Sequence, residues 1–334
     1  MKETTSRCRM LLSSLALLFA SVGAIAQAPT QAPASATTAK PDYLSVEQLR
    51  ARYADRHSRF TTIKGVEIHY KDEGKGPVLL LVHGSQSSLR IWDDTAAKLK
   101  SRYRVIRFDV AGMGLSGRVS DEAAANATPL DIVLGLLEQL KIDKLSFVGN
   151  SSGGTLGMFL AAKRPDLVER LILTNVPADV VRYEHMVQPQ SFIDAQAEAK
   201  RMGGFQSRHF WDEFLTYFSG KGERISKQKR DEYYDFNRRV PEKHPIALIA
   251  QIGDGVEANR LMAQVTTPTL LIWGTKDALL PFAAMQSLER HLEKAPVSRV
   301  IMPDVGHYPP LEVPERITQL VAAYIEAGVP NVAP

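Results

Sequence analysis

Short apolar runs alternate with stretches of helical spacing through most of the chain, and this alternation constrains the fold more than any other feature. The runs are rich in branched aliphatic residues, as strands covered on both faces require, and they occupy 78–82, 105–110, 145–148, 171–174, 269–273 and 300–302. Between them, apolar residues recur at helical intervals over 89–100, 130–140, 154–163, 283–293 and 314–326. The pattern predicts an α/β fold with a mostly parallel central sheet flanked by helices.

The alternation breaks between about Ala178 and Gln264, where the sequence becomes helical, aromatic and charged. A segment whose two ends both join the sheet is more simply an excursion from one fold than an independent second domain. We therefore predict a core formed by residues 45–180 and 265–334, with a helical cap inserted at 181–264. A short helix opens the core, because Ser45 and Gln48 have the spacing of a capping box.

The N-terminus has the features of a secretory signal peptide at residues 1–26. Basic residues precede an apolar run from Met10 to Ala20, and the pattern Ala24-Ile25-Ala26 follows. A retained membrane anchor is the alternative, but the apolar run is shorter than the roughly 20 residues that a span requires. We expect cleavage near Ala26, a periplasmic or secreted protein, and a flexible linker at 27–44.

Cysteine and charge content exclude several classes of protein. Cys8 is the one cysteine of the 334 residues and precedes the apolar run, so the mature chain would have no disulfide, thiolate metal site or cysteine nucleophile. Removing residues 1–26 takes three basic residues and one acidic residue from the 41 and 37 of the whole chain, which leaves a net charge of +2. So small a net charge predicts no nucleic-acid partner and no stable membrane association after signal removal.

The most informative motif is a strand that passes through G-x-S-x-G into a helix, Leu145-Ser-Phe-Val-Gly-Asn-Ser-Ser-Gly-Gly154. This is the pattern of a nucleophile elbow. Such a turn strains the serine backbone and leaves no space for side chains two residues before and after it, a need that Gly149 and Gly153 meet. The pattern selects Ser151 as the nucleophile rather than Ser152; a Gly/Ser-rich turn without chemistry is the alternative.

With this motif the sequence resembles the α/β-hydrolase superfamily over essentially everything from Thr61 to Glu326, apart from the cap. Val82-His83-Gly84-Ser85 follows an apolar strand and is similar to the oxyanion loop of that family. The resemblance implies that the backbone N–H groups of Ser85 and Ser152 form the oxyanion hole. It also implies a structural role for His83, whose place before the nucleophile breaks the family's order of catalytic residues.

A serine hydroxyl needs an imidazole to remove its proton, and the imidazole needs a carboxylate to fix its tautomer. Two later strands lead into such groups, through 270–277 to Asp277 and through 300–307 to His307. The order Ser, Asp, His matches the family, which implies that Ser151 is the nucleophile, His307 the base and Asp277 the acid that orients it.

Two other acids and one glycine motif offer alternatives. Asp179 follows the strand that ends near Thr174, a position that some family members use, and Asp304 is close to His307 in sequence, although we interpret it as a loop residue. Residues 112–117 spell G-x-G-x-x-G, but a dinucleotide site needs a helix there and 118–128 is loop-like and polar. The turn after Asp109 instead resembles a structural turn of the hydrolase family.

Aromatic residues recur at helical spacing in the cap: Phe210, Trp211, Phe214, Tyr217 and Phe218. They either line the substrate pocket, with Trp211 and Phe214 in contact with the substrate, or only pack the cap onto the core. Arg238 and Arg239 either orient an acidic substrate or belong to a solvated face.

These residues predict a serine hydrolase that cleaves a carboxylic ester of a small or medium-sized apolar substrate through an acyl-enzyme, with no metal or organic cofactor. A carbon–carbon bond hydrolase, lactonase, thioesterase or acyltransferase uses the same parts, and a non-catalytic binding protein is a further alternative. Tyr233 and Tyr234 are similar to the cap tyrosines of epoxide hydrolases, but that enzyme type, like the dehalogenases, needs an aspartate nucleophile in place of Ser151. The natural substrate and the oligomeric state stay open.

Overall fold

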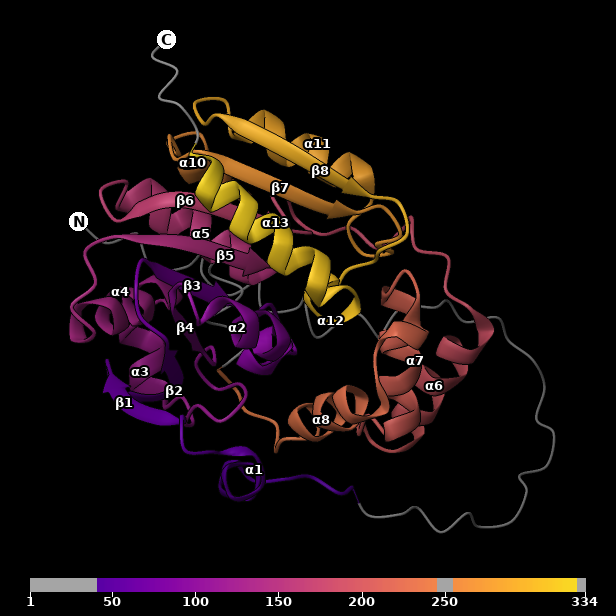
Figure 1. Ribbon diagram of the computed structural model, residues 1–334. Helices are drawn as coiled ribbons and strands as arrows, with labels where there is room; N and C mark the ends of the chain where they lie inside the picture. The colour runs from indigo at the N-terminus through magenta and orange to yellow at the C-terminus, as the bar shows by residue number, and fades with distance from the viewer. Residues whose placement is uncertain (1–40, 245–254, 329–334) are drawn as a thin grey trace, which may run out of the picture.

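The computed structural model describes residues 41–244 and 255–328. One eight-stranded sheet organises the fold. The strand order is β1-β2-β4-β3-β5-β6-β7-β8, and every pair from β4 to β8 is parallel, whereas β2 runs antiparallel to β1 and β4. The predicted α/β fold with a mostly parallel sheet is confirmed (Figure 1). The strands are β1 (Arg59–Ile63), β2 (Val66–Glu73), β3 (Val78–Val82), β4 (Arg104–Phe108), β5 (Leu145–Asn150), β6 (Val168–Thr174), β7 (Thr269–Gly274) and β8 (Val297–Met302).

Helices cover both faces of the sheet because each buries one apolar stripe against the branched side chains of the strands. One face is packed by α3 (Asp121–Asn126), α4 (Pro129–Gln139), α5 (Ser152–Lys163), α10 (Gly255–Met262) and α11 (Phe282–His291). The other is packed by η1 (Leu89–Trp92), α2 (Asp93–Leu99), α12 (Pro309–Glu312) and α13 (Pro314–Ala327).

The excursion between β6 and β7 contains α6 (Gln190–Arg201), α7 (Arg208–Phe218), η2 (Gly222–Arg224) and α8 (Lys227–Asn237). In Figure 1 these helices lie beyond the end of the sheet toward which β5, β7 and β8 point. By contrast α10, which the predicted cap at 181–264 included, packs on α5, and its Leu261 and Met262 belong to the core. Helix α10 therefore belongs to the core and not to the cap.

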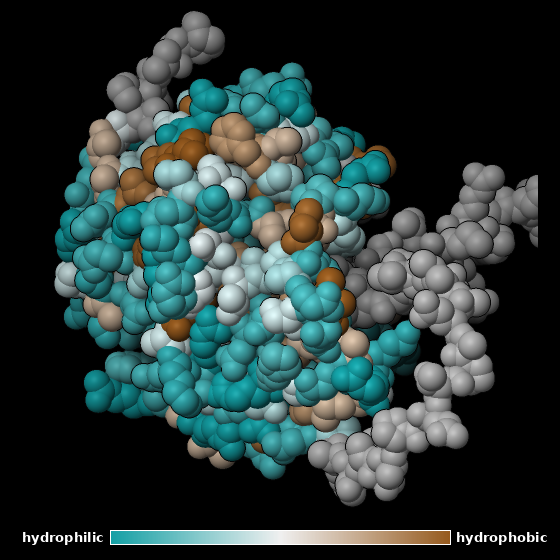
Figure 2. Space-filling model, turned by 90° about the vertical axis from the view of Figure 1, so that its right-hand side faces the viewer, coloured by the Kyte–Doolittle hydropathy of each residue, from teal (hydrophilic) through white to brown (hydrophobic). Residues whose placement is uncertain are grey.

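The cap side has a mainly hydrophilic surface. Figure 2 shows apolar residues there as separate small patches among polar ones. The aromatic residues of α7 contribute little to it, because Phe210, Trp211, Phe214 and Phe218 are all buried. None of the helices in residues 41–244 and 255–328 combines the length and hydrophobicity needed to cross a bilayer.

The chain enters the described part along the cap. Leu44, at the end of the predicted flexible linker, is buried and forms a parallel β-bridge with Arg239, so the last residues of that linker are ordered. The capping box at Ser45 and Gln48 is present and opens α1 (Val46–Tyr53). The predicted signal peptide and the rest of the predicted linker, up to residue 40, lie outside the described residues.

The structure differs from the sequence-based expectation at four elements. Strands β1 and β2 lie before the first predicted strand, and their polar residues hid them from a search for apolar runs. Helix α3 lies within 118–128, which we expected to be a loop; Ser120 caps it, and only Ala123 is buried. Strand β8, expected to be covered on both faces, lies at the sheet edge and buries only Met302.

Candidate active site

Ser151 stands at the turn between β5 and α5 in a strained conformation, with φ 52° and ψ −134°. Its N–H donates to Thr174 O at 3.1 Å, and its carbonyl accepts from Gly154 N–H at 2.8 Å. A Cβ on Gly149 would lie 2.5 Å from Gly154 Cα, and one on Gly153 would lie 2.4 Å from His83 O. The glycine positions of the motif are therefore fixed by close backbone approach.

His307 and Asp277 form a buried pair. His307 lies in the loop between β8 and α12, and its Nδ1 is 2.6 Å from Asp277 Oδ2. Asp277 follows β7, and its Oδ1 accepts from the backbone N–H groups of Leu279 and Leu280 at 2.8 and 2.9 Å. A carboxylate held in this way keeps the imidazole proton on Nδ1 and leaves Nε2 as an acceptor.

A third residue, Asn175, contacts this pair; it was not predicted from the sequence. Its Nδ2 donates to Asp277 Oδ2 at 2.7 Å, while its Oδ1 accepts from Gly274 N–H at 3.0 Å. Its position directly after β6, at the same sheet end as Asp277, is the signal that could have identified it.

The elbow and the histidine loop are joined through the residue before the serine. Asn150 Nδ2 donates to the backbone oxygens of His307 at 3.1 Å and of Thr174 at 3.0 Å. The His307 N–H in turn donates to Phe218 O, at the end of cap helix α7, at 2.7 Å. The structure thus brings Ser151, Asp277 and His307 to the carboxyl ends of β5, β7 and β8.

The loop after β3 lies against the serine. A Cβ on Gly84 would be 3.3 Å from Ser151 Oγ, and Ser85 Oγ is 3.0 Å from Ser152 Oγ. The backbone N–H groups of Ser85 and Ser152 form no hydrogen bond with another described residue. Because α5 begins at Ser152, the positive end of its dipole also faces this region, so the arrangement suits a developing negative charge.

His83 has both ring nitrogens occupied. Its Nδ1 donates to Gly84 O at 2.7 Å, and its Nε2 accepts from Val110 N–H at 3.0 Å. Complete burial lowers the pKa of His83, which favours the neutral ring. The histidine joins two loops and has no lone pair left for proton transfer, in agreement with a structural role.

The competing acids lie elsewhere. Asp179 accepts from Ser287 Oγ at 2.5 Å and contacts His291 at 3.0 Å, both on α11. Asp304 pairs with Arg224 and Arg316. Neither carboxylate contacts His307. Within the described ranges, no group of three or more His, Cys, Asp or Glu side chains is placed to hold a metal ion.

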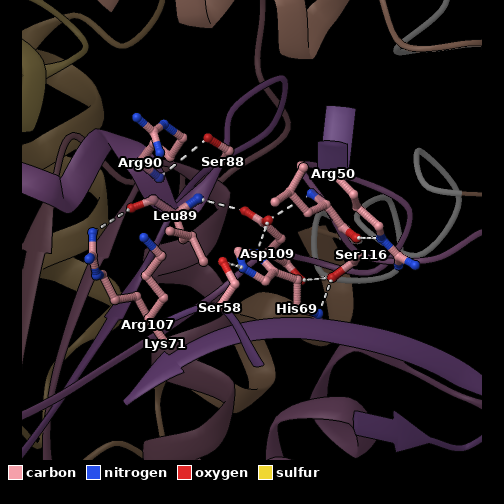
Figure 3. A network of polar contacts seen from close by, with 12 residues as sticks. Arg50, Ser58, His69, Lys71, Ser88, Leu89, Arg90, Arg107, Asp109 and Ser116 are labelled. Carbon is pink, nitrogen blue, oxygen red and sulfur yellow. Dashed lines mark hydrogen bonds and ion pairs between the residues drawn. The ribbon is translucent and has the colours of Figure 1, made fainter. Parts of the chain in front are cut away.

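The G-x-G-x-x-G turn packs against the carboxylate of Asp109, since a Cβ on Gly114 would lie 2.1 Å from Asp109 Cγ. Figure 3 shows the polar contacts of Asp109 with His69 and Leu89. Asp109 Oδ1 accepts from Leu89 N–H at 2.7 Å, and its Oδ2 accepts from Leu115 N–H at 2.8 Å and lies 2.7 Å from His69 Nδ1. Arg239, from the segment after α8, donates to Gly114 O at 3.0 Å. An anion of the protein already fills the turn, so it is structural and holds no phosphate.

The same network contains a hydrogen-bonded series of serine, histidine and aspartate that is separate from Ser151, His307 and Asp277, since Ser58 Oγ is 2.9 Å from His69 Nε2. Ser58 Oγ also accepts from Asp55 N–H at 3.1 Å, and Ser58 is not among the residues with positive φ. Asp109 is committed to two backbone amides at the same time. This series fastens the chain before β1 to the core and lacks the strained elbow of Ser151.

We expect Asp109→Asn to lower the free energy of unfolding by about 3 kcal/mol at pH 7, because it leaves buried donors unsatisfied. Burial raises the pKa of Asp109, but the hydrogen bonds from His69 and Leu115 outweigh it and hold that pKa below the usual value. The contribution is therefore complete above pH 3.8 and is lost as the pH falls through the lower folded-state pKa. Urea unfolding at pH 7 and pH 3 should show the difference from wild type shrinking in acid. The exposed Asp143→Asn is the control, and equal stability of Asp109→Asn and wild type at pH 7 would contradict this role.

The aromatic residues of α7 pack the cap onto the active-site loop. The Phe214 ring lies 6.3 Å from that of Tyr308, which is 5.0 Å from the His307 ring. The ring centroids of Trp211 and Tyr233 are 5.7 Å apart, and the Tyr233 hydroxyl is 3.2 Å from the Tyr308 hydroxyl. These contacts favour the packing interpretation and place the Phe214 ring one ring away from His307.

Arg238 and Arg239 do not belong to a solvated face, which corrects that expectation. They are 8% and 9% exposed. Arg238 pairs with Asp235 and Asp42, and Arg239 pairs with Glu242. Arg239 also donates to the backbone oxygens of Gly114 and Ser116 in the core, so both cations have partners within the protein and neither has a free charge to offer a substrate.

Comparison with known proteins places this site in a family. The model of the alpha/beta hydrolase fold family matches residues 77–314, and the chain belongs to that family. The chain is 28% identical over 268 residues to a probable esterase of Oryza sativa subsp. japonica, covering 77% of this chain and 94% of the relative. It is also 28% identical over 273 residues to haloalkane dehalogenase 2 of Mycobacterium tuberculosis, covering 78% and 90%.

Solved structures agree on the fold. An enol-lactonase from Burkholderia xenovorans LB400 superposes with a TM-score of 0.61 at 22% identity, covering 80% of this chain and all of that one. A meta-cleavage product hydrolase from Pseudomonas fluorescens gives a TM-score of 0.63 at 22% identity, covering 81% and 98%. The activities named for these proteins differ, so the comparisons define a hydrolase family without selecting the bond that is cleaved.

Proposed function

We propose that the protein is a carboxylic ester hydrolase that acts through an acyl-enzyme formed on Ser151. The observation that carries the proposal is the strained serine at the elbow, at the same sheet end as the buried pair of His307 and Asp277. A binding protein on this scaffold would have no use for a strained nucleophile position at the same sheet end as an imidazole whose Nε2 has no hydrogen bond among the described residues.

In the proposed mechanism, Ser151 Oγ attacks the ester carbonyl carbon while His307 Nε2 takes its proton. The N–H groups of Ser85 and Ser152 stabilise the negative oxygen of the tetrahedral intermediate. The carbon–oxygen bond to the alcohol then breaks, and the imidazolium gives its proton to the leaving oxygen. A water molecule then gives a proton to the same imidazole and attacks the acyl carbon. The bond from that carbon to Ser151 Oγ breaks, and the imidazolium returns the proton to Oγ as the acid leaves.

The choice of an ester and of an apolar substrate rests on the surroundings of the triad. The Tyr308 ring lies against His307, and the Phe214 ring lies against Tyr308. Trp211 and Phe214 remain our candidates for contact with the substrate, although their observed contacts are with other rings. Serine at position 151 argues against halide displacement, since the dehalogenases need an aspartate there.

A substrate panel tests this proposal against its alternatives. Purified protein should hydrolyse p-nitrophenyl acetate and butyrate faster than a matched thioester, a lactone or a vinylogous diketone that reports carbon–carbon cleavage. A higher kcat/KM for the lactone, the thioester or the diketone would move the assignment to that class, while the triad would stay the same. The absence of turnover on every member would favour the non-catalytic alternative.

We also propose that the chain is exported and cleaved near Ala26, on the strength of the basic, apolar and small-residue pattern at residues 1–26. The intact mass of protein purified from the periplasm or medium should correspond to a chain that begins at Gln27. A mass that includes residues 1–26 would contradict cleavage of the signal peptide.

A further inference from the structure

One buried carboxylate near the active site has no role in the mechanism described above. Glu312 ends α12, five positions after His307 in the chain, and it is only 4% exposed. Among the described residues, no basic side chain pairs with it. Burying a carboxylate without a cation is costly, so its partners need an explanation.

The partners of Glu312 are backbone N–H groups from two separate segments. Gly306 N–H, directly before His307, lies 3.0 and 3.2 Å from the two carboxylate oxygens. Gly220 N–H, just after cap helix α7, donates to Oε2 at 2.8 Å. A single side chain thus joins the loop that carries the proposed base to the cap.

The two segments also touch directly. A Cβ on Gly306 would lie 2.3 Å from Phe218 O and 2.5 Å from Gly220 N, and one on Gly220 would lie 2.5 Å from Asp304 O. The His307 N–H donates to that same Phe218 O at 2.7 Å. Only glycine permits this approach, so the contact is specified by the chain.

We propose that Glu312 is a positioning residue. Its carboxylate fixes the backbone of His307 against the cap segment 218–220, and we call this contact the clamp. The base and this end of the cap then keep one relative position during turnover. The inference rests on the proposed function, because it assigns to Glu312 an effect on the geometry of the base.

The charges around Glu312 support this role. The cations of neighbouring elements have other partners, since Arg224 of η2 and Arg316 of α13 pair with Asp304, and Arg90 of η1 pairs with Glu232. Burial raises the pKa of Glu312 above its usual value, although the backbone N–H groups lower it in part. When an acid has a higher pKa in the folded than in the unfolded protein, stability falls as the pH rises from the unfolded-state pKa to the folded-state pKa, so ionisation of Glu312 costs stability. Residues kept for function often show this behaviour.

The test compares Glu312→Gln with wild type and with Glu315→Gln, an exposed acid three residues further on that pairs with Lys98. Glutamine preserves the shape but directs an NH₂ group toward backbone donors, which frees the His307 loop. We expect kcat per active site to fall about 10- to 100-fold, with KM changed less than about threefold, because a displacement of the base affects the transition state most. Active sites are counted by fluorophosphonate labelling, and Glu315→Gln should behave as wild type.

A lower melting temperature of Glu312→Gln with unchanged kcat per labelled site would overturn the proposal and leave a structural role only. Hydrogen exchange of the wild-type amides tests the clamp without any variant. Gly220 and Gly306 should have similar protection factors, and exchange of Gly220 at least 100-fold faster would also overturn it. If wild-type protein does not react with the fluorophosphonate, the proposed function has failed, whereas the exchange result still reports on the clamp.

Discussion

Replacing Ser151 with alanine is expected to lower kcat/KM for p-nitrophenyl butyrate by about 10⁵-fold or more. The strained elbow holds this hydroxyl beside the loop of Gly84 and Ser85, and without it no acyl-enzyme forms. The oxyanion hole and the binding surface remain, so a small residual rate above that in water is expected. Steady-state kinetics over a range of ester concentrations measures the loss.

The fold should survive this change, because Ser151 Oγ has no hydrogen bond among those observed in the described residues. The melting temperature should stay within a few degrees of that of wild type. Ser58→Ala is the matched control, since Ser58 also lies in a series with a histidine and an aspartate but lacks the elbow. Full activity of Ser151→Ala, or a larger loss in Ser58→Ala, would remove Ser151 from the mechanism.

Asp277→Asn is expected to lower kcat about 10⁴-fold with little change in KM. The asparagine oxygen would remain at the site that accepts from Leu279 and Leu280 N–H. Its NH₂ group would then face His307 Nδ1 and force the imidazole into the tautomer with the proton on Nε2. That tautomer cannot accept the serine proton.

Asp179→Asn distinguishes this assignment from its main competitor. Asp179 contacts Ser287 and His291 on α11, so we expect kcat to be unchanged and stability to fall slightly. A large loss of kcat in Asp179→Asn together with a small one in Asp277→Asn would exchange the two roles.

The residues of the proposed site could be identified from the sequence because each follows an apolar run that forms a strand. The strands before Ser151, Asp277 and His307 are apolar runs, and the carboxyl ends of parallel strands meet at one edge of a sheet. The spacing of Gly149 and Gly153 also has a local cause that a sequence displays. Such features do not depend on distant contacts.

The features that were missed depend on contacts between distant segments. Asn175 and Glu312 are single polar residues, and only the fold shows that one orients Asp277 and the other joins the cap to the His307 loop. Arg238 and Arg239 resemble a solvated pair in sequence, but Arg238 pairs with Asp42, and Arg239 donates to the distant backbone oxygens of Gly114 and Ser116. Periodicity reports which face of an element is apolar and cannot report such partners.

The cap was predicted as a helical insertion, but the detailed packing of its aromatic residues could not be predicted. Phe214 contacts Tyr308 because α7 ends at the His307 loop, a contact between residues far apart in the sequence. The contact of Phe214 with Tyr308 and the clamp by Glu312 both depend on this one junction. Substrate preference and the position of the base are therefore expected to change together when residues 218–220 are altered.

The most direct test of the account is to treat the wild-type protein with a fluorophosphonate at neutral pH and locate the adduct by tandem mass spectrometry. We predict one adduct per chain, on Ser151, formed rapidly in wild type and at least 100-fold more slowly in Asp277→Asn. An unmodified chain, or an adduct on Ser152, Ser58 or any other serine, would contradict the assignment.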